Sequence, residues 1–127
     1  MPIDITARPA AGRQIVERYG NGGFTIAGVR HPGSVLVFRD RTLAWASRGA
    51  DDIDVAALRL ALSGEAVPRI LVVGCGRSFA PRPAGFDEAM RQAGAGVEWM
   101  DTGAACRTFN VLLLEDRDVA AALIAVE

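Results

Sequence analysis

The chain has 127 residues, of which half are hydrophobic and 23% are charged, so it holds enough apolar material for one folded domain of ordinary size. The formal net charge is −1 and the arginines are scattered, which excludes the clustered basic face that a nucleic-acid-binding protein needs. All 14 basic residues are arginines, and the lack of lysine excludes Schiff-base chemistry and the P-loop lysine.

The first third of the sequence has the pattern of β structure that follows a flexible arm. Residues 1–12 are rich in Ala, Pro and Arg without periodicity, and this composition predicts the flexible arm. Residues 13–127 are expected to form a single α/β domain. Turns are expected at Gly20–Gly23, His31–Gly33 and Arg39–Arg41. Between them, β-branched and aromatic residues predict a β meander. Its expected strands are Ile15–Tyr19, Phe24–Ile26, Ser34–Phe38 and Thr42–Trp45.

The rest of the sequence alternates between helices and strands. We expect a first helix with Asp52 as its N-cap and Gly64 at its C-terminal end, and a second helix over 84–93 that Gly94 terminates. A third helix should begin at Thr102 as N-cap, with Asp101 beside it. This order implies parallel strand pairs with helices packed on the sheet. The expected strands are Arg69–Gly74, Gly96–Met100 and Val119–Val126.

Gly74, Cys75, Gly76 and Arg77 follow a strand that we expect to be central in the sheet. Ligands of open α/β sheets bind beyond the carboxyl ends of such strands, and Arg77 could contact an anion there. However, the third glycine of a dinucleotide fingerprint is missing, and the residues that follow do not start a helix. The pattern is therefore more typical of a tight turn than of a nucleotide site.

The triplet that begins at Asp101 has the Asp-Thr-Gly sequence of aspartic proteases. Only one such triplet exists in the chain, and a helix is expected after it in place of the β-rich fold that those enzymes need. We therefore interpret Asp101 and Thr102 as residues that start a helix.

Cys106 lies beside Arg107 in the first turns of this helix, where a thiolate is favoured. A nucleophilic cysteine needs a base, and nothing in the spacing places His31, which is the only histidine, near Cys106. A packed, reduced cysteine is the interpretation that we prefer, with redox sensing or ligand contact left open. Cys75 and Cys106 lie too far apart for a close ligand pair, so we expect no metal and no cofactor.

Five motifs, taken together in their order, resemble a known family. The resemblance is to small proteins catalogued as a domain of unknown function, which include mitochondrial NADH dehydrogenase (complex I) assembly factor 3 and the adipogenesis-associated domain-containing protein. It covers about residues 15–126, and its most specific part lies within Asp101–Asn110. The motifs are Gly20–Phe24, Gly33–Val37, Val72–Gly76, Met100–Asn110 and Ala121–Ile124.

The resemblance implies a three-layer α/β fold. A central mixed five-stranded sheet would carry helices on its faces, with an N-terminal β-hairpin or meander as an elaboration. The resemblance also implies a protein without established enzymatic activity, since the assembly-factor relatives bind other proteins while a membrane respiratory complex is put together. The chain departs from the family in two ways. It has no mitochondrial presequence, as a bacterial member should, and it carries Cys75 where relatives often have a hydroxyl residue, which puts an essential role for Cys75 in doubt.

Two functions therefore stay open. The first is a non-catalytic protein-binding module that assists assembly or maturation of a membrane respiratory complex. The second is a small enzyme or anion-binding protein with a pocket between the Gly74–Arg77 loop and the helix start after Asp101. The candidate ligand or partner surface comprises Gly74, Cys75, Gly76, Arg77, Asp101, Thr102, Cys106, Arg107 and Asn110.

The expected partners are other proteins, among them membrane-complex subunits or assembly factors. We expect no nucleic acid and no membrane insertion, and a homodimer is left open. The chain shows no signal-peptide pattern, and its longest uninterrupted apolar run, Val119–Val126, is far shorter than a bilayer span. We therefore expect a cytoplasmic protein.

Overall fold

We describe the fold from a computed structural model, which covers residues 12–64 and 67–127. The predicted N-terminal arm lies outside the described residues, apart from residue 12. The strands are β1 (Val16–Gly20), β2 (Gly23–Ile26), β3 (Val29–Pro32), β4 (Val35–Val37), β5 (Thr42–Ala44), β6 (Ile70–Gly74), β7 (Gly96–Met100) and β8 (Val119–Leu123). The helices are the short 3₁₀ helix η1 (Ala50–Asp52) and the α-helices α1 (Val55–Leu62), α2 (Phe86–Ala93) and α3 (Thr102–Leu114).

The strands form two sheets. The central sheet has the order β5-β4-β8-β6-β7, in which β6 runs parallel to both β7 and β8, and β4 runs antiparallel to β5 and β8. This is the mixed five-stranded sheet that the family resemblance implied. The predicted meander does not stay in one sheet, because β1, β2 and β3 form a separate antiparallel sheet while β4 and β5 join the central one.

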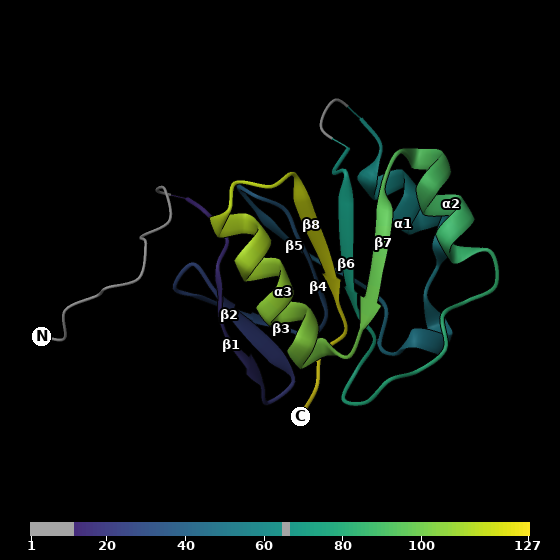
Figure 1. The fold of residues 1–127 in the computed structure, drawn as a ribbon. Helices are drawn as coiled ribbons and strands as arrows, with labels where there is room; N and C mark the ends of the chain where they lie inside the picture. Colours follow the sequence, from purple (N-terminus) through teal and green to yellow (C-terminus); the bar gives the residue numbers. More distant parts are fainter. Residues whose placement is uncertain (1–11, 65–66) are drawn as a thin grey trace, which may run out of the picture.

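The central sheet separates two hydrophobic cores, which makes the fold three-layered. Because neighbouring residues of a strand point to opposite faces, Leu71 and Val73 of β6 lie in the core beneath α1 and α2. Val72, between them, lies in the other core with Phe109 of α3 and Phe24 of the small sheet. Figure 1 shows α3 and the small sheet on one side of β6 and β7, with α1 and α2 on the other. The predicted α/β three-layer architecture is confirmed.

Two of the predicted helix caps are wrong by one or two residues. Asp54, and not Asp52, caps α1 by accepting a hydrogen bond from the amide of Ala57 at 3.0 Å. Asp52 instead accepts bonds from the amides of Arg48 and Gly49, which close η1. Both aspartates suit a cap by sequence, so only the path of the preceding turn selects between them.

The second shifted cap is that of α3, because Asp101 is its N-cap and Thr102 is its first helical residue. Asp101 accepts from the amide of Ala104 at 2.9 Å. The predicted end of α2 is confirmed, since Gly94 terminates it in the left-handed conformation with φ 103°. For α1, the C-cap is Ser63 and Gly64 follows it with φ 124°.

Two strand boundaries also differ from the prediction. His31 and Pro32 belong to β3, where they pair with Phe24 and Gly23, so the turn begins only at Gly33. β8 ends at Leu123, three residues before the predicted end. The amide of Ile124 still donates to the carbonyl of Gly74 on β6 at 2.9 Å. After it, the amide of Ala125 binds the Ser34 hydroxyl at 2.9 Å and the carbonyl of Val126 accepts from the amide of Gly22.

Candidate functional site

Gly74 lies at the carboxyl end of β6, where α3 begins directly against it. A Cβ atom on Gly74 would lie 2.8 Å from the Cα of Thr102 and 3.1 Å from the Cβ of Ala105. Such distances are far below van der Waals contact, so no other residue fits without moving the helix. The first glycine of the predicted loop is therefore required for close packing between the strand and the helix.

Thr102 is completely buried at this contact, and both its hydroxyl and its amide are engaged. The hydroxyl donates to the carbonyl of Ile124 at 2.8 Å and accepts from the amide of Gly76 at 3.0 Å. The amide of Thr102 donates to the carbonyl of Gly76 at 2.8 Å. One side chain thus joins the start of α3, the turn after β6 and the segment after β8, and we call this contact the Thr102 joint.

The helix start offers little to a bound anion. Free amides at a helix N-terminus are what usually hold an anion. In α3 the amide of Thr102 donates to Gly76, and the amides of Ala104 and Ala105 donate to the side chain and the carbonyl of Asp101. Asp101 also places a carboxyl group at this end of the helix. The arrangement therefore favours an architectural role for the helix start.

Cys75 is buried and contacts the loop that follows it. Its sulfur accepts a hydrogen bond from the amide of Ala80 at 3.4 Å and lies 3.6 Å from the carbonyl oxygen of Ser78, to which the thiol donates. A serine hydroxyl has the same donor and acceptor capacity, so a hydroxyl residue at this position could hold the loop equally well. The role of Cys75 in this structure is to fix the backbone of residues 78–80.

Cys106 packs among the apolar side chains beneath α3, with only 3% of its surface exposed. This burial raises the pKa of the thiol to about 12, and the nearby charge of Arg107 offsets only part of that effect. A thiol with so high a pKa stays protonated at neutral pH and is a poor nucleophile. His31 lies on β3, and no hydrogen bond between it and Cys106 is present.

Asn110 binds the small sheet to α3. Its side-chain oxygen accepts from the amide of Val16 at 2.9 Å, and its side-chain nitrogen donates to the carbonyl of the same residue at 2.8 Å. The amide side chain thus substitutes for a neighbouring strand at one position along the outer edge of β1. Asn110, like Thr102, has an architectural role here.

Two residues of the predicted surface are well exposed, namely Arg77 and Arg107. Sequence reasoning did not select the aromatic residues near this end of the sheet. Tyr19 is 44% exposed, and its hydroxyl lies 2.6 Å from where a Cβ of Gly103 would be. Phe79, on the loop after β6, is 69% exposed. The sequence did offer one sign that Phe79 is unusual. It lies in a loop rich in proline and glycine, whereas a side chain of that size is usually buried.

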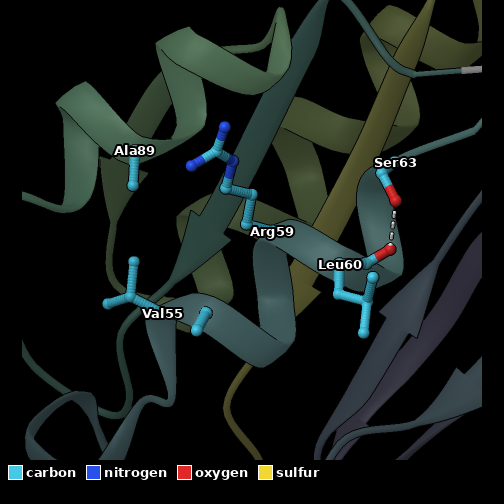
Figure 2. Close-up of a pocket in the computed structure, with 6 residues that line it drawn as sticks. Val55, Arg59, Leu60, Ser63 and Ala89 are labelled. Carbon is cyan, nitrogen blue, oxygen red and sulfur yellow. Dashed lines mark hydrogen bonds between the residues drawn. The ribbon is translucent and has the colours of Figure 1, made fainter.

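The pockets that we describe lie away from the Thr102 joint. The largest is an open groove of about 500 Å³ between α1 and α2, drawn in Figure 2. Its lining is Val55, Ala56, Arg59, Leu60, Ser63 and Ala89, none of which belongs to the predicted surface.

Across residues 12–64 and 67–127 there is no group of three or more His, Cys, Asp or Glu side chains placed to hold a metal ion. In the same part of the chain, no helix is long and apolar enough to cross a membrane.

The layers and the sheet order define a small three-layer α/β domain of a class already seen in solved structures. One is the solution structure of a Bordetella pertussis protein described as an Mth938-like domain. It is 25% identical to this chain with a TM-score of 0.79, and the alignment covers 98% of this chain and 95% of that one. The chain belongs to the family described as protein of unknown function (DUF498/DUF598), whose model matches residues 16–124.

Two relatives illustrate the range of this family. An uncharacterized protein of Rhodobacter capsulatus is 40% identical over 114 residues, which is 90% of this chain and 86% of that protein. The NADH dehydrogenase [ubiquinone] 1 alpha subcomplex assembly factor 3 of Xenopus tropicalis is 37% identical over 117 residues. That alignment covers 92% of this chain but only 64% of the assembly factor, so the chain spans less than two thirds of that relative. The predicted family membership is confirmed.

Proposed function

We propose that this chain is a protein-binding module that assists the assembly of a membrane respiratory complex of the NADH dehydrogenase type. The observation that carries the proposal is its similarity to named assembly factors along nearly the whole described domain. The site is consistent with this proposal, because the buried side chain of Thr102 and the half-buried side chain of Asn110 bind backbone groups of the chain itself. A binding module needs an ordered surface, and these bonds fix the surface around the α3 start.

A deletion of the gene in the native host tests the proposal. We expect blue native gels to show less of the fully assembled NADH dehydrogenase and more of its subassemblies, with NADH oxidation by isolated membranes reduced in proportion. Re-expression of the intact chain should restore both readouts. Because assembly factors act before the complex is finished, adding the purified chain to membranes of the deletion strain should restore neither.

A deletion strain with normal complex assembly would contradict the proposal. If the deletion strain contains a normal amount of fully assembled and active complex during respiratory growth, the proposed assembly role is wrong. An enzyme or anion-binding protein would then become the better hypothesis.

A further inference from the structure

The loop after β6 presents an exposed aromatic ring on a fixed backbone. This loop, residues 75–85, connects β6 to α2 along the lower end of the molecule in Figure 1. Phe79 lies in it with 69% of its surface exposed, which is more than any other aromatic side chain of the described residues. Burying a phenylalanine side chain is favourable, and the isolated chain gains only a small part of this stabilisation at Phe79.

The backbone on both sides of Phe79 is held by buried groups. The carbonyl of Ser78 and the amide of Ala80 both bind the buried sulfur of Cys75. The carbonyl of Ala80 also accepts a hydrogen bond from the indole nitrogen of Trp99 at 2.8 Å. Trp99 is itself packed edge-on against Phe86, with the ring centroids 5.3 Å apart.

Further contacts stiffen the second half of the loop. The guanidinium of Arg82 lies over the ring of Trp99, 5.5 Å from its centroid, and forms an ion pair with Asp87 at 2.5 Å. Pro81 and Pro83 restrict the backbone on either side of Arg82. The loop therefore has the properties of a preorganised binding element, in which little conformational entropy remains to be lost when a partner binds.

The charges around Phe79 indicate the chemistry of that partner. Residues 75–85 contain two arginines and no acidic residue. Arg82 is neutralised by Asp87, whereas Arg77 is exposed and forms no ion pair within the described part of the chain. The Thr102 joint places this loop next to the start of α3, which carries the exposed Arg107 and the half-buried Asp101. The carboxylate of Asp101 is engaged by the amide of Ala104, so Arg77 and Arg107 are the more exposed charges here. A partner with carboxylates around an apolar pocket would match this surface.

From these contacts we infer that Phe79 is the anchor by which this chain binds a partner protein, its ring entering an apolar pocket bordered by Asp or Glu side chains that face Arg77. The inference rests on the proposed protein-binding function and locates the partner surface at the loop after β6. Aromatic side chains, phenylalanine included, and arginine are enriched in the cores of protein interfaces, where a few well-packed residues dominate the binding energy.

Site-specific photocrosslinking in the native host tests this inference. A benzophenone amino acid replaces Phe79 in one strain and Leu60 in another, because Leu60 is 75% exposed on α1, away from this loop. Mass spectrometry then identifies the crosslinked peptides. We expect position 79, and not position 60, to crosslink to one protein, at an apolar site with Asp or Glu nearby in that protein.

The other outcomes overturn the inference. They are equal crosslinking from positions 79 and 60, crosslinks to lipid, nucleic acid or a second copy of this chain, and crosslinks to a site bordered by basic residues. A partner that is captured only from position 60 would overturn the role of Phe79 and leave the proposed protein-binding function intact. Failure to capture a protein from either position would count against both.

Binding measurements give a quantitative test. The protein identified by crosslinking is purified, and its affinity for variants of this chain is measured. Phe79→Ala should weaken binding about 30-fold, and Arg77→Glu about 10-fold with a reduced dependence on salt. The matched control Leu60→Ala should change the affinity less than about 2-fold.

Two variants of Cys75 test whether the loop must be held in place. Cys75→Ser keeps the bonds to the loop backbone and should bind the partner normally, while Cys75→Ala loses these bonds and should bind several-fold more weakly. Equal affinity for the wild-type chain and Phe79→Ala would overturn the anchor role, and equal affinity for the two Cys75 variants would overturn preorganisation.

Discussion

At the scale of single residues, two polar side chains of α3, the buried Thr102 and the half-buried Asn110, bind backbone atoms that would otherwise lack these partners. Thr102 engages the carbonyl of Ile124 and the amide of Gly76, and Asn110 engages both backbone groups of Val16. Within the described residues, no buried side-chain nitrogen or oxygen lacks a hydrogen-bond partner. Since an unpaired buried polar group costs about 1–3 kcal/mol, these side chains contribute to stability mainly by preventing that loss.

The clearest consequence concerns Asn110. Asn110→Ala removes two hydrogen bonds and leaves the amide and carbonyl of Val16 without these partners, so the free energy of unfolding should fall by about 1–3 kcal/mol. Urea denaturation followed by circular dichroism measures this change. Arg107→Ala, an exposed substitution on the same helix, should change stability by less than about 0.5 kcal/mol. Equal effects of the two substitutions would contradict the proposed role of Asn110.

Cys106 should be unreactive in the folded chain at neutral pH. In the Cys75→Ser background, where Cys106 is the only thiol, we expect its modification by Ellman's reagent at pH 7.5 to be far slower than in urea. Burial raises the pKa of Cys106 to about 12 from its ordinary value of 9.0. A proton bound more tightly in the folded state stabilises the fold below about pH 9, and this contribution is lost as the pH rises toward 12.

The pH dependence has its own control. Over pH 9 to 11, the free energy of unfolding should fall less steeply for Cys106→Ala than for the wild-type chain, because alanine has no proton to lose. Urea titrations at several pH values measure both slopes. Rapid modification of native Cys106 at pH 7.5 would show that the thiol is accessible and would contradict its assignment as a packed residue.

At the scale of secondary-structure elements, the contact between β6 and α3 is the tightest junction of the site. α3 begins close to the backbone of Gly74, and the Thr102 joint then connects it to the turn after β6 and to the segment after β8. The position of the predicted surface depends on this junction, because it fixes the loop after β6 relative to the helix start. A side chain at position 74 should therefore disturb both.

The corresponding prediction compares two glycines in strands. Gly74→Ala places a Cβ 2.8 Å from the Cα of Thr102 and should lower the free energy of unfolding by about 1–3 kcal/mol. Gly96→Ala in β7 is the matched control, since its nearest neighbour would be the carbonyl oxygen of Arg69 at 3.7 Å, and it should change stability by less than about 0.5 kcal/mol. Thermal or urea denaturation separates the two, and a fully stable Gly74→Ala would show that the helix can shift at little cost.

Sequence reasoning predicted most elements and failed mainly at choices that only tertiary contacts decide. The alternation of helices and apolar strands after residue 52 was sufficient to predict α2, α3, β6 and β7. The selection of Asp54 over Asp52 as a cap depends on η1, which the apolar pattern does not reveal. The separation of the β meander into two sheets depends on the pairing of β4 with β8, more than 80 residues later in the chain.

The candidate site shows the same division. The motifs around Gly74 and Asp101 were correctly predicted to follow adjacent strands, because parallel strands end at the same edge of a sheet. Whether their side chains face solvent or backbone could not be predicted, since burial at this edge depends on how closely α3 approaches β6. Phe79 was not selected for a related reason, because local sequence does not show which loop residue faces outward.

At the scale of the whole molecule, two hydrophobic cores share one sheet. Phe86 belongs to the core beneath α1 and α2, and Phe109 belongs to the core beneath α3 and the small sheet. Both side chains are buried, with at most 1% of their surface exposed. Alternate residues of the same central strands pack into the two cores. Because the cores share these strands, we expect them to unfold together in one transition.

Two substitutions test this coupling. Phe86→Ala and Phe109→Ala should each lower the free energy of unfolding by about 3–5 kcal/mol, with a single transition that coincides when followed by Trp fluorescence and by circular dichroism. The tryptophans Trp45 and Trp99 are associated with the core that contains Phe86. If Phe109→Ala produced a separate early transition seen only by circular dichroism, the cores would be independent units.

The position of β8 has a consequence for biosynthesis. β8 fills the middle of the central sheet, between β4 and β6, although its residues 119–123 follow every other strand in the chain. A nascent chain that ends before residue 119 therefore has β4–β5 and β6–β7 as two unjoined ribbons with open edges. Such edges invite pairing with other chains. The central sheet can close only after residues 119–123 have left the ribosome, so the open strand edges favour aggregation during that interval.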